Sequence, residues 1–378
     1  MRIAINTRFL LSSKMEGFGW FTYETVKRMV EDHPDVEFIF FFDRPYHQRF
    51  IFGPNVTPVV LHPQARHPIL FRIWFNLSVH RALKKYKADL FFSPDGYLSL
   101  PSSIPQIGVI HDLNFEHYPQ DIPPSARKYL LKYFPLFAKK ATHIITVSQF
   151  SKEDIIKSYN IPDNKITVAH NGGSEAFHPL ADQEKLDSRE NFADGNEYFV
   201  FVGALHPRKN LNKLFEAFEA FKKETSSPTQ LVIVGEKLWK DSSIEELYNS
   251  LECKHDIQFT GHLALEDLTK AVGGAKALVF PSYFEGFGIP LVEAMKAGVP
   301  VTCGNLTALP EVAGDAALFF DPFNINDIAD CLKKLDTDAN LCEQLSKVGL
   351  ERSKEFSWDK TADIIWNVLE STLSEKSN

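Results

Sequence analysis

The sequence predicts an α/β protein made of two doubly wound, Rossmann-like parallel-sheet domains that follow each other along the chain. Its 378 residues exceed one ordinary hydrophobic core and suit two domains of about 180 residues each. Short β-branched and aromatic runs alternate with helical patterns, which is typical of sheets built from βαβ units. A polar stretch, 179–196, interrupts this alternation, and we interpret it as a linker.

Thirteen strands are predicted, seven before the polar stretch and six after it. In the first domain we expect them at residues 2–6, 37–42, 58–61, 89–93, 106–110, 143–147 and 166–169. In the second domain we expect them at residues 198–202, 230–234, 257–260, 277–280, 299–302 and 317–320. The domains then cover 1–178 and 179–359, and an amphipathic helix over 360–378 can pack back on the first.

Two helices between these strands can be located from local patterns. After Asn210, apolar residues recur at helical spacing, which predicts a helix with one buried face. Ser148 precedes another predicted helix and is a plausible N-cap residue, because its hydroxyl can accept from a free backbone N–H.

The composition excludes several classes of protein. A hydrophobic fraction of 44% and a charged fraction of 24% fit a soluble globular protein. We find no run of about 18 apolar residues and no signal-peptide core near the start, so we expect a cytoplasmic protein. The four cysteines match no zinc or redox spacing and are interpreted as reduced packing residues.

Charge is divided unevenly along the chain. Residues 1–180 carry 21 Lys and Arg against 16 Asp and Glu, whereas the remainder carries 20 against 33. The basic half indicates an anionic partner, but its cations are scattered and form no nucleic-acid-reading motif, so nucleic acid is not expected. Basic and bulky apolar residues mix in 66–87 and 127–140. These segments fit either ordinary amphipathic helices or peripheral contact with an anionic membrane surface.

Ligands of open α/β sheets bind beyond the carboxyl ends of the strands, so we searched there for chemistry. The strongest pattern is a glycine-rich turn between a strand and a helix, in residues 281–298. Gly286 and Gly288 leave backbone N–H groups uncovered near a helix N-terminus, which favours an anion. Glu285 and Glu293 then need hydroxyl partners, as a sugar and a ribose would supply. Alternatively, both are ordinary charges in the first turns of a helix.

Two further clusters follow predicted strands. Arg208 and Lys209 precede a helix start and can stabilise the charge that develops on a departing diphosphate, although such a pair can also be a solvated surface. His111 follows the strand at 106–110 and can bind a sugar hydroxyl, although it can also be structural. Gly17 and Gly19 follow the first strand and would let a loop approach a phosphate or the acceptor closely.

The spacing of Glu285 and Glu293 around Gly-Phe-Gly resembles the paired-glutamate motif of glycosyltransferase family 4, and the similarity extends over nearly the whole chain. The resemblance implies the GT-B fold, in which two Rossmann-like domains face each other across a cleft. It also implies retaining transfer from a nucleotide diphosphate sugar. In the family the first glutamate contacts the transferred sugar and the second binds the ribose. The backbone between them, here Gly286, Phe287 and Gly288, touches sugar and phosphate.

The resemblance also assigns roles in the other clusters. Lys209 matches the phosphate-binding lysine of the family. Many members carry an arginine directly after the preceding glycine, where this chain has Ala204, so Arg208 is expected to supply that function. His111, within His-Asp-Leu, matches a histidine that contacts the donor sugar.

Two glycine-containing turns complete the predicted site. Gly17 and Gly19 match a glycine-rich loop at the donor diphosphate, although Trp20 stands where an arginine often follows. The loop expected to hold the nucleotide base consists of Gly261, His262 and Leu263.

Metal-independent catalysis is expected, with cationic side chains and helix N-termini in place of a metal ion. An Asp-x-Asp sequence at 336–338 has the form that binds divalent cations in the other major glycosyltransferase fold. Because it separates helical segments with no strand before it, we interpret it as an exposed loop. The favoured donor is GDP-mannose, followed by UDP-glucose, and the expected acceptor is a glycan or a lipid-linked sugar.

Two other functions remain open from the sequence. One is a nucleotide-sugar epimerase with a GT-B-like fold, and the other is a non-catalytic nucleotide-sugar-binding protein. A nicotinamide-dependent dehydrogenase is disfavoured because the Gly-x-Gly-x-x-Gly fingerprint does not follow the first strand.

Overall fold

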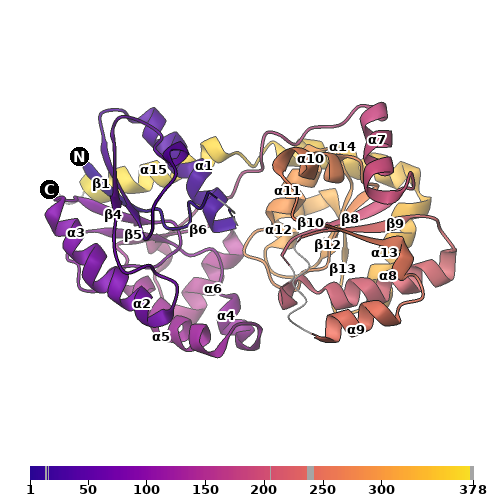
Figure 1. Cartoon of the computed structure of the whole chain (residues 1–378), viewed down its shortest axis with the longest axis horizontal. Helices are drawn as coiled ribbons and strands as arrows, with labels where there is room; N and C mark the ends of the chain where they lie inside the picture. Colours follow the sequence, from indigo (N-terminus) through magenta and orange to yellow (C-terminus); the bar gives the residue numbers. More distant parts are fainter. Residues whose placement is uncertain (13–14, 16, 205, 236–241, 375–378) are drawn as a thin grey trace. The chain divides into compact units, whose positions relative to one another are not determined.

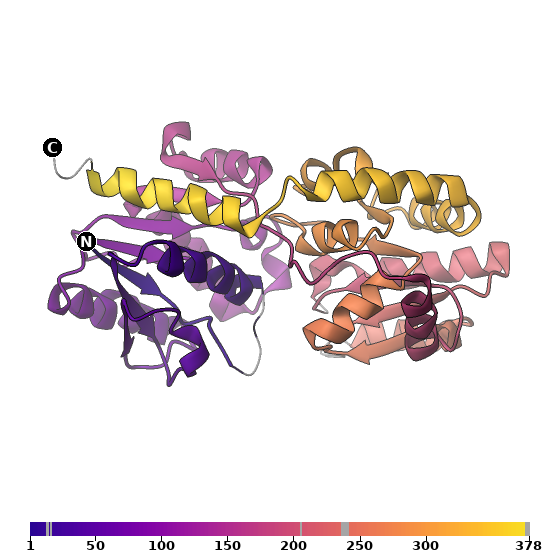
Figure 2. The same cartoon turned by 90° about the horizontal axis from the view of Figure 1, so that it is seen from above.

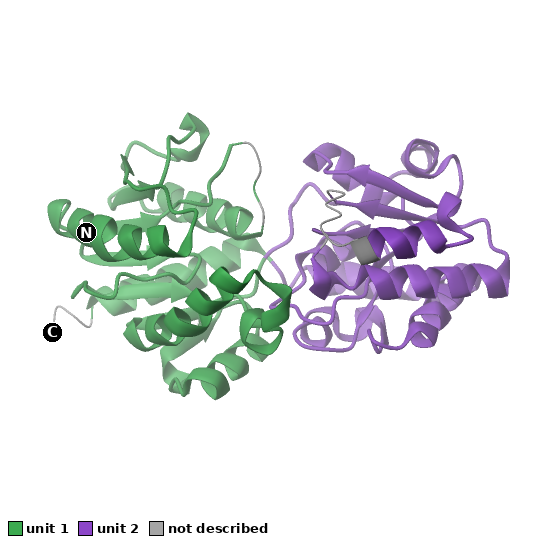
Figure 3. Ribbon diagram, turned by 60° about the horizontal axis from the view of Figure 1, so that its bottom comes forward, with its two compact units in different colours: residues 1–171, 357–378 green, residues 172–356 purple. Residues whose placement is uncertain are grey.

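The computed structural model (Figure 1) describes the chain except for residues 13–14, 16, 205, 236–241 and 375–378. The chain forms two compact units, which Figure 3 distinguishes by colour. Unit 1 comprises residues 1–171 and 357–378, and unit 2 comprises 172–356. The boundaries expected from the sequence, after residues 178 and 359, fall a few residues further along the chain.

Unit 1 is built on a seven-stranded sheet in the order β3-β2-β1-β4-β5-β6-β7, with every neighbouring pair parallel. Its strands are β1 (Arg2–Asn6), β2 (Glu37–Phe42), β3 (Val56–Val60), β4 (Leu90–Ser93), β5 (Gln106–Val109), β6 (His143–Thr146) and β7 (Ile166–Val168). All seven were predicted, with ends displaced by two residues at most. The strand order reverses between β1 and β4, which is the switch point where ligands of such sheets bind.

Helices connect or follow the strands of unit 1. They are α1 (Gly17–Asp32), α2 (Pro68–Ile73), the π-helix η2 (Trp74–Val79), α3 (His80–Lys85), α4 (Asn114–His117), α5 (Pro124–Lys140), α6 (Gln149–Tyr159) and α15 (Trp358–Ser374). Short 3₁₀ helices are η1 (Gln48–Phe50), η3 (Pro119–Asp121) and η4 (Asp163–Lys165). As predicted, Ser148 caps α6: its Oγ accepts a 3.0 Å hydrogen bond from the backbone N–H of Ser151.

The closing helix α15 belongs to unit 1 although it follows unit 2 in the chain. It lies alongside α1 (Figure 2). Contacts between the helices include the Phe21 and Trp358 rings at 6.1 Å between centroids and the Arg28–Asp359 ion pair. His33, directly after α1, stacks on Trp366 at 3.5 Å. An amphipathic sequence with one buried face explains this packing.

Unit 2 repeats the architecture with a six-stranded parallel sheet in the order β10-β9-β8-β11-β12-β13. Its strands are β8 (Tyr198–Val202), β9 (Gln230–Val234), β10 (Ile257–Gly261), β11 (Ala277–Phe280), β12 (Val301–Gly304) and β13 (Ala317–Phe320). These six strands also match the prediction to within two residues. Here the strand order reverses between β8 and β11.

The helices of unit 2 are α7 (Asp182–Ala193), α8 (Leu211–Thr225), α9 (Ser242–Ser250), α10 (Leu265–Gly273), α11 (Ile289–Lys296), α12 (Leu309–Ala313), α13 (Ile325–Thr337) and α14 (Ala339–Ser353). Its 3₁₀ helices are η5 (Pro207–Lys209), η6 (Lys254–Asp256) and η7 (Gly314–Ala316). The helix predicted after Asn210 is α8, which buries its apolar face as expected.

The interpretation of 179–196 as a linker was wrong, because α7 lies there within unit 2. This helix buries only Ser188 and Ala193, so it lacks the apolar stripe that reveals a helix in sequence. It is held in place by polar contacts, among them the Arg189–Glu197 ion pair at 3.0 Å. Over the described residues, no helix combines the length and the apolar character needed to cross a membrane.

Candidate active site

Three charged side chains meet at the switch point of the unit 2 sheet. Arg208 and Lys209 follow β8, and Glu285 follows the neighbouring strand β11. One carboxylate oxygen of Glu285 lies 2.6 Å from Nη1 of Arg208, and the other accepts from Nζ of Lys209 at 2.7 Å. Glu285 and Lys209 are buried, whereas Arg208 remains partly exposed. The sequence predicted all three residues for the site, and the structure brings them into direct contact.

Backbone hydrogen bonds hold this corner together. The amide N–H of Tyr283 donates to the carbonyl of Arg208 at 3.1 Å, which fixes the two turns against each other. Asn210 adopts a left-handed conformation with φ of 60°. From there its side-chain amide donates to the carbonyls of Pro281 and Pro322, which follow β11 and β13. The turn that carries the cations is therefore tied to three strand ends.

The electrostatics of the cluster keep Glu285 ionised. Burial alone would raise its carboxyl pKa, but the charges and hydrogen bonds of Arg208 and Lys209 outweigh burial and lower it to about 2. A permanently ionised carboxylate can accept hydrogen bonds from hydroxyl groups but cannot act as a proton donor. The cluster as a whole carries one excess positive charge, which suits an anionic ligand.

The turn from Gly286 to Gly288 leads directly into α11. Gly288 has φ of +112°, and a Cβ built there would lie 2.9 Å from Leu309, so this position favours glycine on two grounds. The Phe287 ring is buried against Phe356 at 5.5 Å, which leaves only its backbone available to a ligand. The N-terminus of α11, which carries a partial positive charge, therefore lies a few residues after Glu285.

Glu293 lies in the second turn of α11, half-buried. A glycine at position 173 lets the chain pass close to this helix, since a Cβ there would lie 2.9 Å from Val292. Burial raises the pKa of the Glu293 carboxyl to about 8, although the backbone N–H of Ser174 and the charge of Lys296 act in the opposite direction.

The predicted base loop lies at the far edge of the same sheet. Gly261 ends β10 with φ of +73°, and its carbonyl accepts from the N–H of Gly235 at 3.0 Å. His262 is exposed and Leu263 half-buried. Strands β9 and β8 lie between β10, which carries this loop, and β11, which Glu285 follows. The distance from β10 to β11 across the sheet is about 14 Å. An elongated ligand is needed to contact both.

His111 and the glycine pair lie in unit 1. His111 follows β5, and its ring lies between the edges of Phe18 and Phe21, at 4.8 and 4.7 Å between centroids. Gly17 and Gly19 belong to the first turn of α1 and not to the predicted loop. A Cβ on Gly19 would lie 2.7 Å from the Phe9 carbonyl, so close packing explains that glycine.

Comparison with known proteins decides the family. The family model described as Glycosyltransferase Family 4 matches residues 15–173, and the one described as Glycosyl transferases group 1 matches residues 182–352. The chain is 31% identical to O-antigen chain mannosyltransferase B of Escherichia coli over 299 residues, which is 78% of either chain. The chain belongs to glycosyltransferase family 4. It is a hexosyltransferase, as the sequence predicted.

Solved structures identify the fold of this family 4 member. Sucrose-phosphate synthase from Thermosynechococcus elongatus superimposes with a TM-score of 0.81 at 18% identity, over 99% of both chains. Anabaena Alr3699/HepE in complex with UDP and glucose gives a TM-score of 0.78 at 17% identity, over 98% of this chain and all of the other. The predicted GT-B fold, with two Rossmann-like parallel sheets, is thereby confirmed.

Sequence reasoning missed several residues near the predicted positions of this glycosyltransferase. Thr307 accepts a 3.1 Å hydrogen bond from the backbone N–H of Glu285 and so positions it. In unit 1, Arg8 and Asp95 follow β1 and β4 and form a buried ion pair. Both follow predicted strands, but their pairing could be recognised only once β1 and β4 were known to be neighbours.

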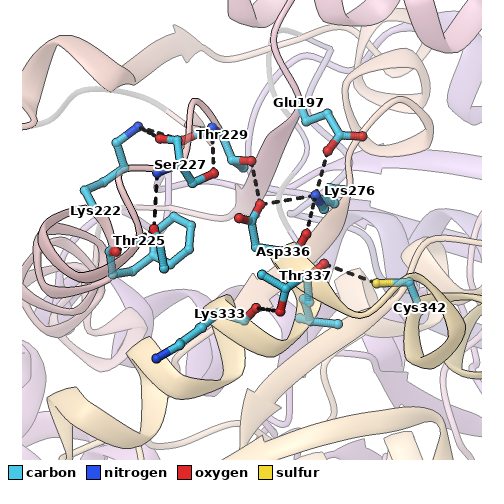
Figure 4. A network of polar contacts seen from close by, with 12 residues as sticks. Glu197, Lys222, Thr225, Ser227, Thr229, Lys276, Lys333, Asp336, Thr337 and Cys342 are labelled. Carbon is cyan, nitrogen blue, oxygen red and sulfur yellow. Dashed lines mark hydrogen bonds and ion pairs between the residues drawn. The ribbon is translucent and has the colours of Figure 1, made fainter.

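The Asp-x-Asp sequence of this glycosyltransferase is structural. Figure 4 shows Asp336 between Thr229 and Lys276, from which it accepts hydrogen bonds of 2.7 and 3.1 Å. Lys276 precedes β11 whereas Glu285 follows it. This network therefore lies at the amino ends of the strands, and the candidate site lies at their carboxyl ends. Asp338 caps α14 by accepting from the N–H of Leu341. Thr337 and Asp338 are exposed where α13 meets α14, as predicted, whereas Asp336 is half-buried and used by the fold.

Within the part of the chain that the structure describes, no group of three or more His, Cys, Asp and Glu side chains is placed to hold a metal ion. The hydrogen bonds of Asp336 and Asp338 assign these residues to the fold, and the cations Arg208 and Lys209 contact Glu285 beside the glycine-rich turn.

Proposed function

We propose that this glycosyltransferase transfers mannose from GDP-mannose to a glycan or lipid-linked acceptor, with retention of configuration and without a metal ion. UDP-glucose is the second donor candidate. The observation that carries the proposal is the contact of one buried carboxylate, Glu285, with two cations at the switch point of unit 2. A diphosphate and a sugar together present the anions and hydroxyls that these groups can bind.

In the proposed reaction the bond between the anomeric carbon and the diphosphate breaks, and negative charge grows on the departing phosphate. Arg208 and Lys209 stabilise that charge as fixed positive groups. Glu285 holds the hydroxyls of the sugar, since its low pKa makes it a permanent acceptor. His111 is the second residue that we assign to the sugar, by its match to the family motif. The departing phosphate assists removal of the acceptor proton.

A covalent glycosyl-enzyme intermediate on Glu285 has little support. Both oxygens of this carboxylate are occupied by cations, which lowers its nucleophilicity. Glu285 is not suited to act as a proton donor either, because its pKa is low, and a diphosphate leaves without protonation.

The choice of donor is supported by similarity. The Escherichia coli relative is named a mannosyltransferase, which favours mannose and a polysaccharide acceptor. The Anabaena structure contains UDP and glucose, which keeps UDP-glucose as the second candidate. In the proposed complex Glu293 binds the ribose, and the loop from Gly261 to Leu263 faces the base.

Nucleotide release with and without acceptor tests the proposed activity. The protein is incubated with GDP-mannose or UDP-glucose, with and without a mannose-terminated oligosaccharide, in the presence of EDTA. Release that requires the acceptor and persists in EDTA supports the proposal, and NMR of the product identifies the anomer. Donor conversion without acceptor would indicate an epimerase. Binding without turnover over a broad acceptor panel would indicate a binding protein.

We also propose that unit 1 contacts an anionic membrane surface, which would bring a lipid-linked acceptor within reach. Ile69, Ile73 and Leu77 recur every fourth residue and are 64, 38 and 43% exposed. Arg72 and Arg81 flank them, also exposed. Apolar side chains beside cations fit the interface of anionic lipids.

Vesicle sedimentation tests this contact. Replacing Ile73 and Leu77 by serine should reduce binding to phosphatidylglycerol vesicles while leaving neutral vesicles unbound. Leu186→Ser, at an apolar residue of unit 2 that is 54% exposed, is the matched control. Equal binding of all variants would contradict the proposed surface.

A further inference from the structure

Unit 1 repeats, at its own switch point, the type of contact that unit 2 makes around Glu285. Arg8 follows β1 and Asp95 follows β4, the neighbouring strands between which the order reverses. Nε of Arg8 lies 2.6 Å from a carboxylate oxygen of Asp95, and both side chains are at most 5% exposed. A buried ion pair is costly unless it is well satisfied, so its presence where ligands bind needs an explanation.

Asp95 is the centre of a tight turn. Its carboxylate also accepts from the side chains of Asn6 at 2.8 Å and Ser93 at 2.9 Å, and from the backbone N–H of Tyr97 at 3.2 Å. Gly96 closes the turn: its N–H donates to the Ser93 carbonyl, and its φ of +79° suits glycine. These contacts fix the direction in which the carbonyl of residue 94 points.

That carbonyl belongs to Pro94 and is 2.8 Å from Nε2 of His111. A carbonyl oxygen can only accept, so Nε2 carries the proton. Burial lowers the pKa of His111, although the bond to Pro94 opposes this, so the ring is neutral near pH 7. Nδ1 then has a lone pair, and it forms no hydrogen bond with the described part of the chain. The rings of Phe18 and Phe21 restrict rotation.

We infer that Asp95 is a positioning residue for His111. Through the turn that it organises, Asp95 aims the Pro94 carbonyl at Nε2, which selects one tautomer and directs a bare Nδ1 toward a sugar hydroxyl. Arg8 balances the charge of Asp95 and keeps the carboxylate in place. The inference rests on the proposed role of His111 in binding the donor sugar, and it adds a residue that the family motif in this chain does not contain.

A double-mutant cycle separates this role from a general effect on the fold. Asp95→Asn should lower kcat about 10- to 100-fold, since a misplaced contact of this kind costs that much. In a His111→Ala background the same change should alter kcat by less than about twofold, because the group through which Asp95 acts is gone. Affinity for GDP should stay within about twofold, because Arg208 and Lys209 belong to unit 2.

Asp43→Asn is the matched control. Asp43 is equally buried and follows β2 of the same sheet, where it binds Arg44 and the N–H of Ala65. Asp43→Asn should leave kcat within about twofold of the wild type. This result would show that the loss of kcat in Asp95→Asn does not arise merely from replacing a buried carboxylate at the carboxyl ends of the strands. If Asp95→Asn does not fold, Ser93→Ala, which removes one donor to the same carboxylate, replaces it in the cycle.

NMR of protein labelled with ¹⁵N-histidine gives a second readout. The wild type should show a single His111 tautomer with the proton on Nε2, and Asp95→Asn should show a mixture of tautomers. An unchanged tautomer, or an equal loss of kcat in the His111→Ala background, would overturn the inference. Full turnover of His111→Ala itself would instead contradict the proposed role of His111 and leave the donor site of unit 2 unaffected.

Discussion

The carboxylate of Glu285 accepts a 2.7 Å hydrogen bond from Lys209, and the two groups neutralise each other in a buried corner of unit 2. Glu285→Gln keeps the shape of the side chain and removes its charge. Because Lys209 and Arg208 then lose their anion, we expect GDP to bind at least as tightly as to the wild type. Turnover should fall about 100-fold, since a fixed electrostatic contact with the reacting sugar is lost.

Calorimetry with GDP and a steady-state assay measure the two effects separately. Glu216→Gln, on the partly exposed surface of α8, is the control and should change neither quantity. A parallel loss of GDP affinity and turnover in Glu285→Gln would contradict the assignment of this residue to the sugar.

Removing a cation should have the opposite effect on binding. Lys209→Met deletes the charged partner of the diphosphate and leaves Glu285 with Arg208 alone. Charge-assisted hydrogen bonds contribute about 1.5–3 kcal/mol, so GDP affinity should fall roughly 10- to 150-fold. Lys213→Met, in the first turn of α8, is the matched control. Undiminished affinity in Lys209→Met would place the diphosphate elsewhere.

Much of this architecture could be predicted because its signals are local. Each strand is a short apolar run, and parallel strands direct the residues after them to one end of the sheet, which is why Glu285 and Lys209 could both be assigned to the site in advance. Their direct contact was not predicted. The helix α7 could not be found, because its few buried residues are small and polar contacts hold it. Arg8 and Asp95 were missed for another reason. Their meaning depends on β1 and β4 being neighbours, which strand order and not local sequence determines.

The glycines illustrate the same limit. Gly288 was assigned to a turn that contacts the ligand. Its φ of +112° is a conformation that favours glycine, as expected for such a turn. Gly19 was assigned to a phosphate loop, yet a Cβ there would lie 2.7 Å from the Phe9 carbonyl, which is a packing reason for glycine. A close packing contact between α1 and the chain after β1 cannot be distinguished from a ligand contact by composition alone.

Glu293 should make stability depend on pH. Its pKa of about 8 in the folded protein exceeds the ordinary value of 4.5, so the folded state binds a proton that the unfolded state lacks between these values. The stability from this group is present below pH 4.5 and is lost as the pH rises toward 8. Denaturation of the wild type and Glu293→Gln from pH 5 to 9 measures it. The stability of the variant relative to the wild type should increase up to about pH 8 and then level off.

Glu293→Ala should weaken binding of GDP, because the ribose hydroxyls lose their acceptor. Hydrogen bonds to a charged group contribute about 1.5–3 kcal/mol, so the loss should be tenfold or more at pH 9, where the carboxylate is ionised. Calorimetry measures the affinity, and Glu266→Ala on the exposed surface of α10 is the control. Unchanged affinity for GDP would remove the ribose assignment.

Asp336 should matter for stability and not for catalysis. Its carboxylate joins Thr229 and Lys276 at the edge of the sheet opposite Glu285, and its side chain is 11% exposed. Asp336→Asn keeps the shape but weakens the ion pair, so the free energy of unfolding should fall by about 1–3 kcal/mol. Turnover at a temperature where the variant is folded should match the wild type, with and without EDTA. A selective loss of turnover that manganese restores would instead show that Asp336 holds a catalytic metal, and the metal-independent mechanism would then be wrong.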